Sequence, residues 1–433
     1  MSGGAVFMRR VWVLMATVFV DMIGFLIVLP LLPFYGERFG ATATTIGLLI
    51  STFAFAQLAS APLWGRLSDR LGRRPVILGS LLLAAGAFVL FGLADTVVLL
   101  FFSRFVQGLG GGTTGVLQAY VSDSVPPEER TRALGWLSAA TSAGVMLGPL
   151  IGSAAFRFSE SAPGFIAAGL CLANFLFAWW LLPESIGHEG EAAGRAEEAA
   201  TAAAKATAVP ELGAPLPSRR PSLRRALLEV ILHPGEERSR LIWIYALGMM
   251  AFMAMNGVIV LYLERVFAVT EADIGWFYTY VGGVSLLMRA LLLGPINHRL
   301  GDVVTMRVGA FALACGLALA PLPGRLLGFA GVILLVPVGT ALLFPATTSL
   351  VSRLSVRRET GQNLGVQQGF GGVSRMLGPI WATAIFQHVG IAAPFWLAAA
   401  LMGGVLAIAL GVHPPARRRT AEVVVPAEPT EPA

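Results

Sequence analysis

The chain alternates between long apolar blocks and short polar loops. Each block approaches the roughly 20 apolar residues that a helix needs to cross the hydrocarbon core of a bilayer. The blocks are continuously apolar rather than apolar at every second residue, so the pattern predicts helices and not the strands of a membrane barrel. We predict twelve spans, at residues 11–35, 44–64, 75–94, 97–121, 132–156, 163–182, 240–263, 272–293, 304–321, 326–350, 361–387 and 391–411.

The composition indicates the same fold class. Hydrophobic residues make up 56% of the 433 residues and charged residues only 13%, whereas soluble domains contain roughly 25% charged residues. A surface with so little charge faces lipid, so we expect an all-α membrane protein. The first apolar block is longer than a signal-peptide core and contains Asp21, and no cleavage pattern follows it, so we expect it to remain as the first helix.

The Lys and Arg residues gather in alternate loops, which predicts the orientation of the helices. With the amino terminus in the cytoplasm, 24 of the 31 Lys and Arg residues fall on the cytoplasmic side and four on the opposite side. Cytoplasmic loops of membrane proteins show this excess of positive charge. We therefore expect a multi-pass protein of the cell (inner) membrane with both termini in the cytoplasm, and no nucleic-acid partner.

Residues 183–239 interrupt the apolar pattern and divide the chain into four parts. We expect a six-helix bundle at 1–182, a cytoplasmic linker at 183–239, a second six-helix bundle at 240–412 and a cytoplasmic tail at 413–433. Near the end of the linker, PSLRRALLEVILHP predicts a short basic amphipathic helix on the cytoplasmic membrane surface. The alternative is a regulatory or partner-docking segment.

The two predicted bundles are related in sequence. Residues 65–72 reappear in altered form at 294–301, an offset of 229, and residues 122–156 align without gaps on 352–386, with ten identities in 35 positions. Two six-helix units in the same orientation, joined by a long cytoplasmic loop, are the architecture of transporters that rock one half against the other. We therefore expect two pseudo-symmetric bundles and alternating access.

Three motifs carry a resemblance to a known family: GRLSDRLGRRP at 65–75, RFVQGLGGG at 104–112 and GVMLGPLIG at 144–152. In this order and in these loops and helices, they resemble the major facilitator superfamily, and the third resembles its antiporter motif. Residues 21–42 and 119–135 are similar to twelve-helix drug:proton antiporters, including tetracycline exporters. The resemblance implies a major facilitator fold and multidrug efflux coupled to protons. The His of helix 8 and the Asp of helix 9 found in tetracycline exporters have no counterpart here, which argues against tetracycline as the substrate.

Two charged residues inside predicted spans are candidates for proton coupling. Asp21 lies ten residues into the first span, about 15 Å deep. Removal from water favours the neutral, protonated form of a carboxyl group, so an acid within a span suggests proton or cation binding. Arg104 lies within the fourth span and is a candidate partner of Asp21, directly or through water. The alternatives are a structural carboxylate and a static polar clamp.

The loop after the second helix is a candidate gate. A carboxylate among arginines can form ion pairs in one state of a transporter and break them in the other. Its counterpart in the second bundle has His298 and Asp302 where the first has Asp69 and Arg73, so we expect that latch to be weaker or differently paired. The candidate gating residues are Gly65, Asp69, Arg70, Gly72, Arg73, Asp123 and Arg130.

Small residues mark one face of the predicted fifth helix: Gly144, Gly148, Pro149 and Gly152. Small residues allow helices to approach closely, and the counterparts of these four are also small or Pro. We therefore expect the fifth and eleventh helices to pack at the interface between the halves.

Three polar residues are candidates for contact with a substrate: Arg375, Gln107 and Arg289. Arg375 aligns with Val145 in the repeat, so its charge is specific to the second half. A buried Arg needs an acceptor or a cavity, which backbone carbonyls or an anionic substrate group would supply. Arg289 could instead extend to the membrane surface.

The sequence favours a transporter over other classes. GLGGGTTG at 108–115 lies within a span and lacks the strand context and lysine of a nucleotide site, and the histidines are scattered, so we expect no cofactor, no metal and no enzyme activity. We expect a monomeric, proton-coupled antiporter that exports small organic compounds. The alternatives are a facilitator or proton symporter that imports a metabolite, and a non-transporting receptor or scaffold.

Overall fold

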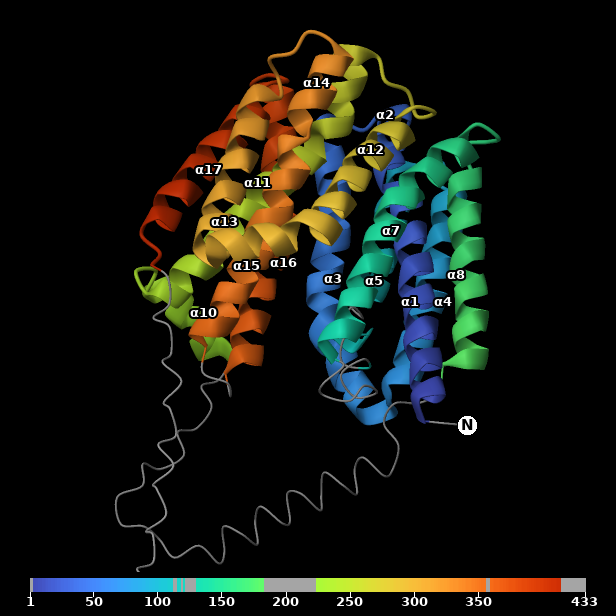
Figure 1. The fold of residues 1–433 in the computed structure, drawn as a ribbon. Helices are drawn as coiled ribbons and strands as arrows, with labels where there is room; N and C mark the ends of the chain where they lie inside the picture. The colour runs from blue at the N-terminus through green and yellow to red at the C-terminus, as the bar shows by residue number, and fades with distance from the viewer. Residues whose placement is uncertain are drawn as a thin grey trace, which may run out of the picture.

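The computed structural model describes residues 3–111, 115–117, 120, 130–182, 223–355 and 359–413. The elements of the first half are α1 (Gly3–Val28), η1 (Leu29–Leu31), α2 (Leu32–Arg38), α3 (Ala43–Leu71), α4 (Arg73–Gly92), α5 (Val97–Gly111), α7 (Arg130–Phe156) and α8 (Ala162–Leu181). Those of the second half are α10 (Leu223–Leu232), α11 (Glu237–Phe267), α12 (Ile274–Leu287), η2 (Met288–Leu292), α13 (Leu293–Leu319), α14 (Leu326–Ile333), α15 (Leu335–Leu354), α16 (Thr360–His388) and α17 (Ala393–Leu410). The two groups stand side by side (Figure 1).

The predicted all-helical membrane fold is confirmed. In the described ranges, nine helical segments are long and apolar enough to cross a membrane. One of them, Ile274–Leu319, contains two predicted spans that separate at Gly301. The helices α5 and α16 occupy two further predicted spans. The count of twelve stays a prediction, because residues 112–114 of the fourth span lie outside the described part and α16 is too polar to stand among the nine.

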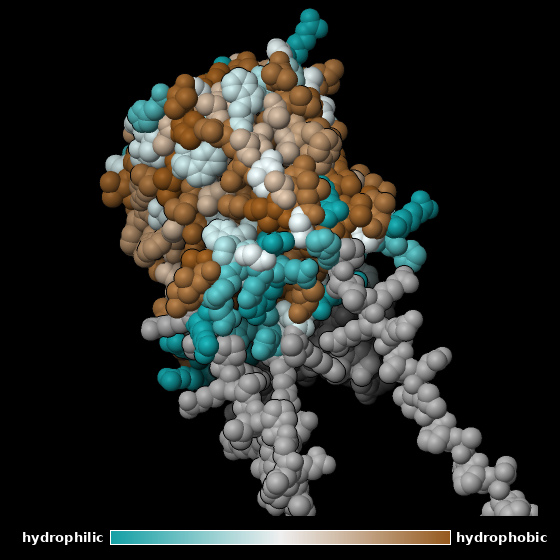
Figure 2. All heavy atoms as spheres, turned by 90° about the vertical axis from the view of Figure 1, so that its left-hand side faces the viewer, coloured by the Kyte–Doolittle hydropathy of each residue, from teal (hydrophilic) through white to brown (hydrophobic). Residues whose placement is uncertain are grey.

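Apolar side chains cover much of the outer surface, as a protein in lipid requires. Figure 2 shows this for the face at the left of Figure 1, where hydrophilic residues gather toward the end that carries α10. We call this end, where α1 begins, α8 ends and α10 lies, the linker end (Figure 1). The opposite end, with α2 and α14, is the outer end.

The internal repeat extends from the sequence to the backbone. Gly72, between α3 and α4, has φ 98° and ψ 161°, and Gly301, 229 residues later within α13, has φ 75° and ψ 163°. A side chain is strained at such positive φ, so glycine is needed for this sharp turn. Both halves therefore reverse direction at the linker end through the same backbone conformation.

Helix packing repeats as well. Within the first half α1 packs against α7 and α8, and within the second half α11 packs against α16 and α17. Between the halves, α3 packs on α16 and α7 packs on α12. The expectation that the fifth and eleventh predicted helices pack at the interface between the halves is therefore confirmed. Each lies at the interface, but each faces a different helix of the other half, because the halves are related by a rotation that pairs unlike helices.

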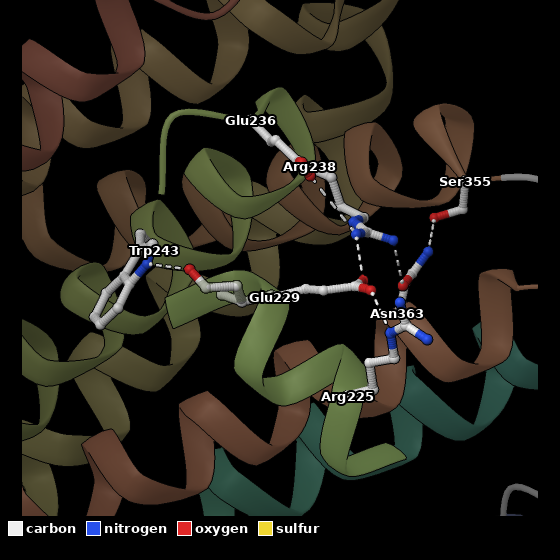
Figure 3. Close-up of polar contacts among 8 residues, drawn as sticks. Arg225, Glu229, Glu236, Arg238, Trp243, Ser355 and Asn363 are labelled. Atoms are coloured by element: carbon white, nitrogen blue, oxygen red, sulfur yellow. Dashed lines mark hydrogen bonds and ion pairs between the residues drawn. The ribbon is translucent and has the colours of Figure 1, made fainter. Parts of the chain in front are cut away.

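The predicted amphipathic helix of the linker is confirmed as α10, which docks on the second half (Figure 3). Its Val230 is buried, and the carbonyl of Val230 accepts a hydrogen bond from Trp243 Nε1 at 3.1 Å. Glu229 Oε2 lies 3.2 Å from Arg238 Nη2 on α11. Arg238 Nη1 is 3.5 Å from Asn363 Oδ1 on α16. The docking therefore ties the end of the linker to the start of two helices.

Candidate functional site

Asp21 lies on the face of α1 that meets α8. One turn before it, the Thr17 carbonyl accepts a hydrogen bond from Asn174 Nδ2 at 2.9 Å. One turn after it, Gly24 lies so close to α8 that a Cβ there would be 3.2 Å from Cys171 Sγ. The side chain is half-buried, and within the described ranges its carboxylate has no hydrogen bond or ion pair. A carboxylate in this setting can bind a proton without first breaking a protein contact.

Arg104 is almost fully enclosed in α5, with 1% of its surface exposed. Its Nη1 donates to Gln107 Oε1 at 2.5 Å, and its guanidinium lies 5.6 Å from the centre of the Phe91 ring. Its Nε and Nη2 have no acceptor among the described residues. Buried donors without acceptors are costly, by about 1–3 kcal/mol each. Gln107, a predicted substrate contact, is thus occupied by Arg104 in this conformation.

The structure does not bring Asp21 and Arg104 together. No ion pair or hydrogen bond joins them, and the neighbours of Arg104 are Gln107 and Phe91 instead. Coupling between Asp21 and Arg104 stays a prediction, which in this conformation has no direct contact to support it.

The predicted gating loop of the first half forms a compact polar cluster. Arg73 Nη1 lies 2.6 Å from Asp69 Oδ1 and donates to Ser68 Oγ at 2.6 Å. Ser68 Oγ in turn donates to the Gly65 carbonyl at 2.8 Å. The cluster spans the turn at Gly72 and ties α3 to α4. Of the other predicted gating residues, Arg70 is exposed, Asp123 lies outside the described residues and Arg130 begins α7 with a side chain that is not described.

The equivalent turn of the second half carries the opposite charge. Asp302, with only 4% of its side chain exposed, lies 3.1 Å from Arg353 Nε at the end of α15. It also accepts hydrogen bonds from Asn297 Nδ2 at 2.7 Å and Ser349 Oγ at 3.1 Å. The sequence predicted that the latch of the second half is weaker or differently paired. The structure shows that it is differently paired. Arg353 was missed, although the repeat offset of 230 aligns it with Asp123.

A cleft of about 690 Å³ opens beside this pair at the linker end. Arg289, on the π-helical turn η2, lines it together with Asp302 and Arg353. Turns of π-helix inside α-helices often mark functional sites. We call this the linker-end cleft; its other lining residues are Leu293, Gly294, Asn297, His298 and Gly301.

The outer end holds the halves together through polar contacts that the sequence did not reveal. Arg38 pairs with Glu160 and lies 3.7 Å from Glu271 of the second half. Glu37 and Arg265 form a second ion pair between the halves at 3.4 Å. Further hydrogen bonds between the halves run from Thr44 to Gln387, from Ser153 to the Glu271 carbonyl, from the Gly275 amide to Ser153 and from Thr279 to the Met146 carbonyl. This conformation is therefore closed at the outer end.

The small face of α7 packs inside its own half. A Cβ at Gly144 would lie 2.7 Å from Met22 Cβ, and one at Gly148 would lie 2.7 Å from Leu26 Cβ, both on α1. The Gly152 backbone lies against Ile27 of the same helix. Pro149 instead faces the other half, where its carbonyl would be 2.5 Å from a Cβ at Gly275 of α12. The motif therefore supports two close contacts at once, one within the half and one across the interface.

Residues 14–337 and 241–431 match the family model described as Major Facilitator Superfamily. The chain belongs to the major facilitator superfamily. The resemblance carried by the three motifs is thereby confirmed, and the protein is a multi-pass membrane transporter of this superfamily.

Similar proteins include drug-resistance transporters. The class D tetracycline resistance protein of Salmonella ordonez is 28% identical over 403 residues, covering 92% of this chain and 95% of its own. Multidrug resistance protein 2 of Bacillus subtilis (strain 168) is 26% identical over 405 residues, covering 92% and 93%. Among solved structures, the human organic anion transporter MFSD10 superposes with a TM-score of 0.67 at 21% identity, over 93% of this chain and 99% of its own. That structure supports the fold alone.

Proposed function

We propose that this superfamily member is a proton-coupled antiporter that exports small organic compounds by alternating access. The observation that carries the proposal is the Asp21 carboxylate, which lies within a membrane-spanning helix and has no protein partner among the described residues. An acid in a span is costly, by roughly 2.5–3.5 kcal/mol on insertion scales, so it is a functional candidate by default. The tetracycline and multidrug resistance proteins to which the chain is similar favour export.

The direction of the cycle follows from the proposed orientation. In the proposed orientation, the protein lies in the inner membrane with both termini in the cytoplasm. The outer end then faces away from the cytoplasm, and the present conformation admits compounds from the cytoplasm. A proton leaves Asp21 toward the cytoplasm while a compound binds. After the halves rock, the outer contacts open, the compound leaves and a proton enters. We propose that one chain carries out this cycle as a monomer, because all of its groups lie within one chain.

Buried Arg104 supports the coupling half of the proposal. Two of its donors lack acceptors among the described residues in this conformation. A state that offers an anionic partner would be favoured, because it removes the cost of these unpaired buried donors. Ionised Asp21 is the candidate acceptor once the helices shift, directly or through water. Protonation of Asp21 would remove that attraction and release the bundle.

The test is transport by the full chain in proteoliposomes, with rhodamine 6G as a cationic probe, chloramphenicol as a neutral one and fluorescein as an anionic one. We expect an imposed proton gradient to drive the movement of at least one probe, and Asp21→Asn to abolish the gradient dependence while Asp21→Glu retains part of it. Exposed Asp95 supplies the matched control, Asp95→Asn, which should behave as the parent protein. Gradient-driven transport that survives in Asp21→Asn would remove Asp21 from the mechanism.

The second candidate function is a facilitator or proton symporter that imports a metabolite, which the same fold supports. The two are distinguished by the response to the gradient. Movement of a probe only down its own gradient, with no response to protons, identifies a facilitator. Accumulation in the same direction as the protons identifies a symporter.

A further inference from the structure

The guanidinium of Arg375 lies over two glycines of its own helix, beside a tyrosine of α11. Long side chains of helices point back toward the helix amino terminus, and Arg375 does so: its Nη1 would be 3.6 Å from a Cβ on Gly371 and its Nη2 3.7 Å from one on Gly372. The Gly371 Cβ would also lie 2.7 Å from Tyr245 Cε1. The absence of side chains at these glycines therefore makes room for both groups in one place.

This place lies where the two halves meet. A Cβ on Gly372 would be 2.8 Å from Leu58 Cδ1, which belongs to α3 of the first half. The repeat partners of Gly371, Gly372 and Arg375 are Thr141, Ser142 and Val145. The arrangement is thus specific to the second half and has no counterpart in the first.

Gln367 adds an unusual feature to the same face of α16. It lies four residues before Gly371 and eight before Arg375, so the three positions share one side of the helix. Its side chain is fully buried, yet neither its amide oxygen nor its amide nitrogen has a partner within the described residues. A native protein rarely leaves such groups unpaired. An occupant that supplies hydrogen-bonding groups would relieve this penalty.

No described acidic residue pairs with the two arginines near this place, although Asp302 lines the linker-end cleft together with Arg289. Arg375 and Arg289 form no ion pair in the described part of the chain, and neither has a hydrogen bond there. The acidic residues of the second half lie near helix ends, such as Glu264 and Glu271 toward the outer end and Asp302 toward the linker end. Arg289 lines the linker-end cleft. Two arginines without acidic partners therefore lie in the second half, Arg289 at that cleft and Arg375 on α16.

Aromatic rings lie beside Gly371, the glycine that Arg375 covers. Tyr245 packs edge-on against Phe344 of α15, with ring centres 5.3 Å apart, and Phe344 lies 6.2 Å from Phe252 of α11. Trp243 and Phe370 form a further edge-on pair at 5.4 Å. Flat apolar ligands bind well against such rings.

We propose that Arg375, together with Arg289, Tyr245 and Gln367, binds the carboxylate of an amphipathic aromatic anion, and that such anions are the substrate class of this transporter. An arginine fork binds a carboxylate through two parallel hydrogen bonds. The phenol and amide supply uncharged donors, and the rings hold the apolar body. The inference rests on the proposed function for the transport of these anions, although the binding itself does not require proton coupling.

The test compares two dyes that share a xanthene ring but differ in charge, fluorescein as the anion and rhodamine 6G as the cation. Equilibrium binding to the purified full chain in detergent is measured by fluorescence anisotropy. We expect the parent protein to bind fluorescein and Arg375→Gln to weaken that binding about 10- to 100-fold, the effect of losing a hydrogen-bonded charge. Arg375→Lys should recover part of the loss, because it keeps the charge without the fork.

Two further variants separate the site from general charge effects. Arg289→Gln alone should weaken fluorescein binding. The double variant Arg289→Gln with Arg375→Gln should bind fluorescein more weakly than Arg375→Gln alone. Exposed Arg325, near the outer end, supplies the matched control, and Arg325→Gln should leave binding unchanged. An unchanged thermal midpoint of Arg375→Gln shows that lost binding is not lost folding. Fluorescein binding that is equal in the parent and Arg375→Gln, or a parent that binds only rhodamine 6G, overturns the proposal.

Proteoliposomes distinguish failure of this site from failure of the proposed function. If a proton gradient drives rhodamine 6G while fluorescein neither binds nor moves, antiport stands and the anion site is overturned. If the gradient drives neither dye but fluorescein binding depends on Arg375, the anion site stands and proton coupling is overturned. Gradient-driven fluorescein movement that is lost in Arg375→Gln supports both.

Discussion

Arg353 and Asp302 form an ion pair, with Arg353 Nε and Asp302 Oδ2 3.1 Å apart. Arg353 lies at the end of α15, and Asp302 directly follows the turn at Gly301 within α13. The internal repeat aligns Asp302 with Arg73 and Arg353 with Asp123, so the two halves carry opposite charges at the same two positions. The neighbouring contact is reversed in the same way. Ser68 accepts from Arg73 at 2.6 Å, whereas its counterpart Asn297 donates to Asp302 at 2.7 Å. The contact beside the turn thus occurs in both halves with its polarity exchanged.

Reversing the charge of Arg353 should break this latch. Arg353→Asp places a second carboxylate beside buried Asp302, and we expect it to lower stability by more than Arg353→Ala, which should cost about 1 kcal/mol because Arg353 is largely exposed. The double variant Asp302→Arg with Arg353→Asp restores the polarity of the first half and should recover part of the loss. Thermal unfolding in detergent measures these effects, with Arg299→Asp, an exposed residue of α13 beside the turn at Gly301, as the control. Equal midpoints for the single and double variants would contradict the pairing.

A wedge at Gly47 should open the outer end. A Cβ there would overlap with Thr383 Oγ1 and lie 2.7 Å from the Pro379 carbonyl on α16. We expect Gly47→Val to disfavour the present conformation and lower transport at least 10-fold, because one of the two alternating states is blocked. Labelling of Thr44→Cys with a membrane-impermeant maleimide should increase, in a background without Cys171 and Cys315.

The matched control for this wedge is Gly86→Val in α4, where a Cβ would meet nothing within 4 Å. It should leave both transport and labelling unchanged. Labelling at Thr44→Cys that is the same with and without the wedge would show that α3 and α16 do not form the outer seal.

A larger side chain at Gly148 should loosen the first half. Gly148→Leu would push against Leu26 Cβ and the Ile23 carbonyl at 2.9 Å. Overpacking of this kind costs about 1–3 kcal/mol, so we expect a lower unfolding midpoint in detergent. Gly135→Leu, on the same helix but with open space around its Cβ position, should have little effect. Similar midpoints for the two variants would contradict the close packing of α7 on α1.

Loss of the Glu229 carboxylate should release α10 from the second half. Glu229 bridges Arg225 and Arg238 (Figure 3), but these side chains are partly exposed, so the pairs contribute at most about 1 kcal/mol. We therefore expect Glu229→Gln to speed hydrogen exchange in residues 223–232 a few-fold without lowering the global unfolding midpoint. Exposed Glu237 supplies a control with the same charge change, Glu237→Gln. Equal exchange in both variants would show that α10 is held by its apolar face alone.

The sequence by itself determined the fold class, the position of most spans, the repeat, the family and the existence of α10. These features depend on local hydrophobicity and on motifs that are contiguous in the chain, which a single sequence displays. It also marked Asp21, Arg104 and Arg375 as charges within apolar blocks, because a charge in lipid stands out whatever its neighbours are.

Only the tertiary structure decided which of these residues meet. It separated Asp21 from Arg104, placed Arg353 on Asp302 and brought Arg375 and Tyr245 to the same glycine, Gly371. It also placed α7 against α12 rather than against α16. Such contacts depend on how each helix is rotated about its axis and on how the halves lean together. These are set by packing between residues more than a hundred positions apart, and the apolar pattern of a span is nearly the same for every rotation.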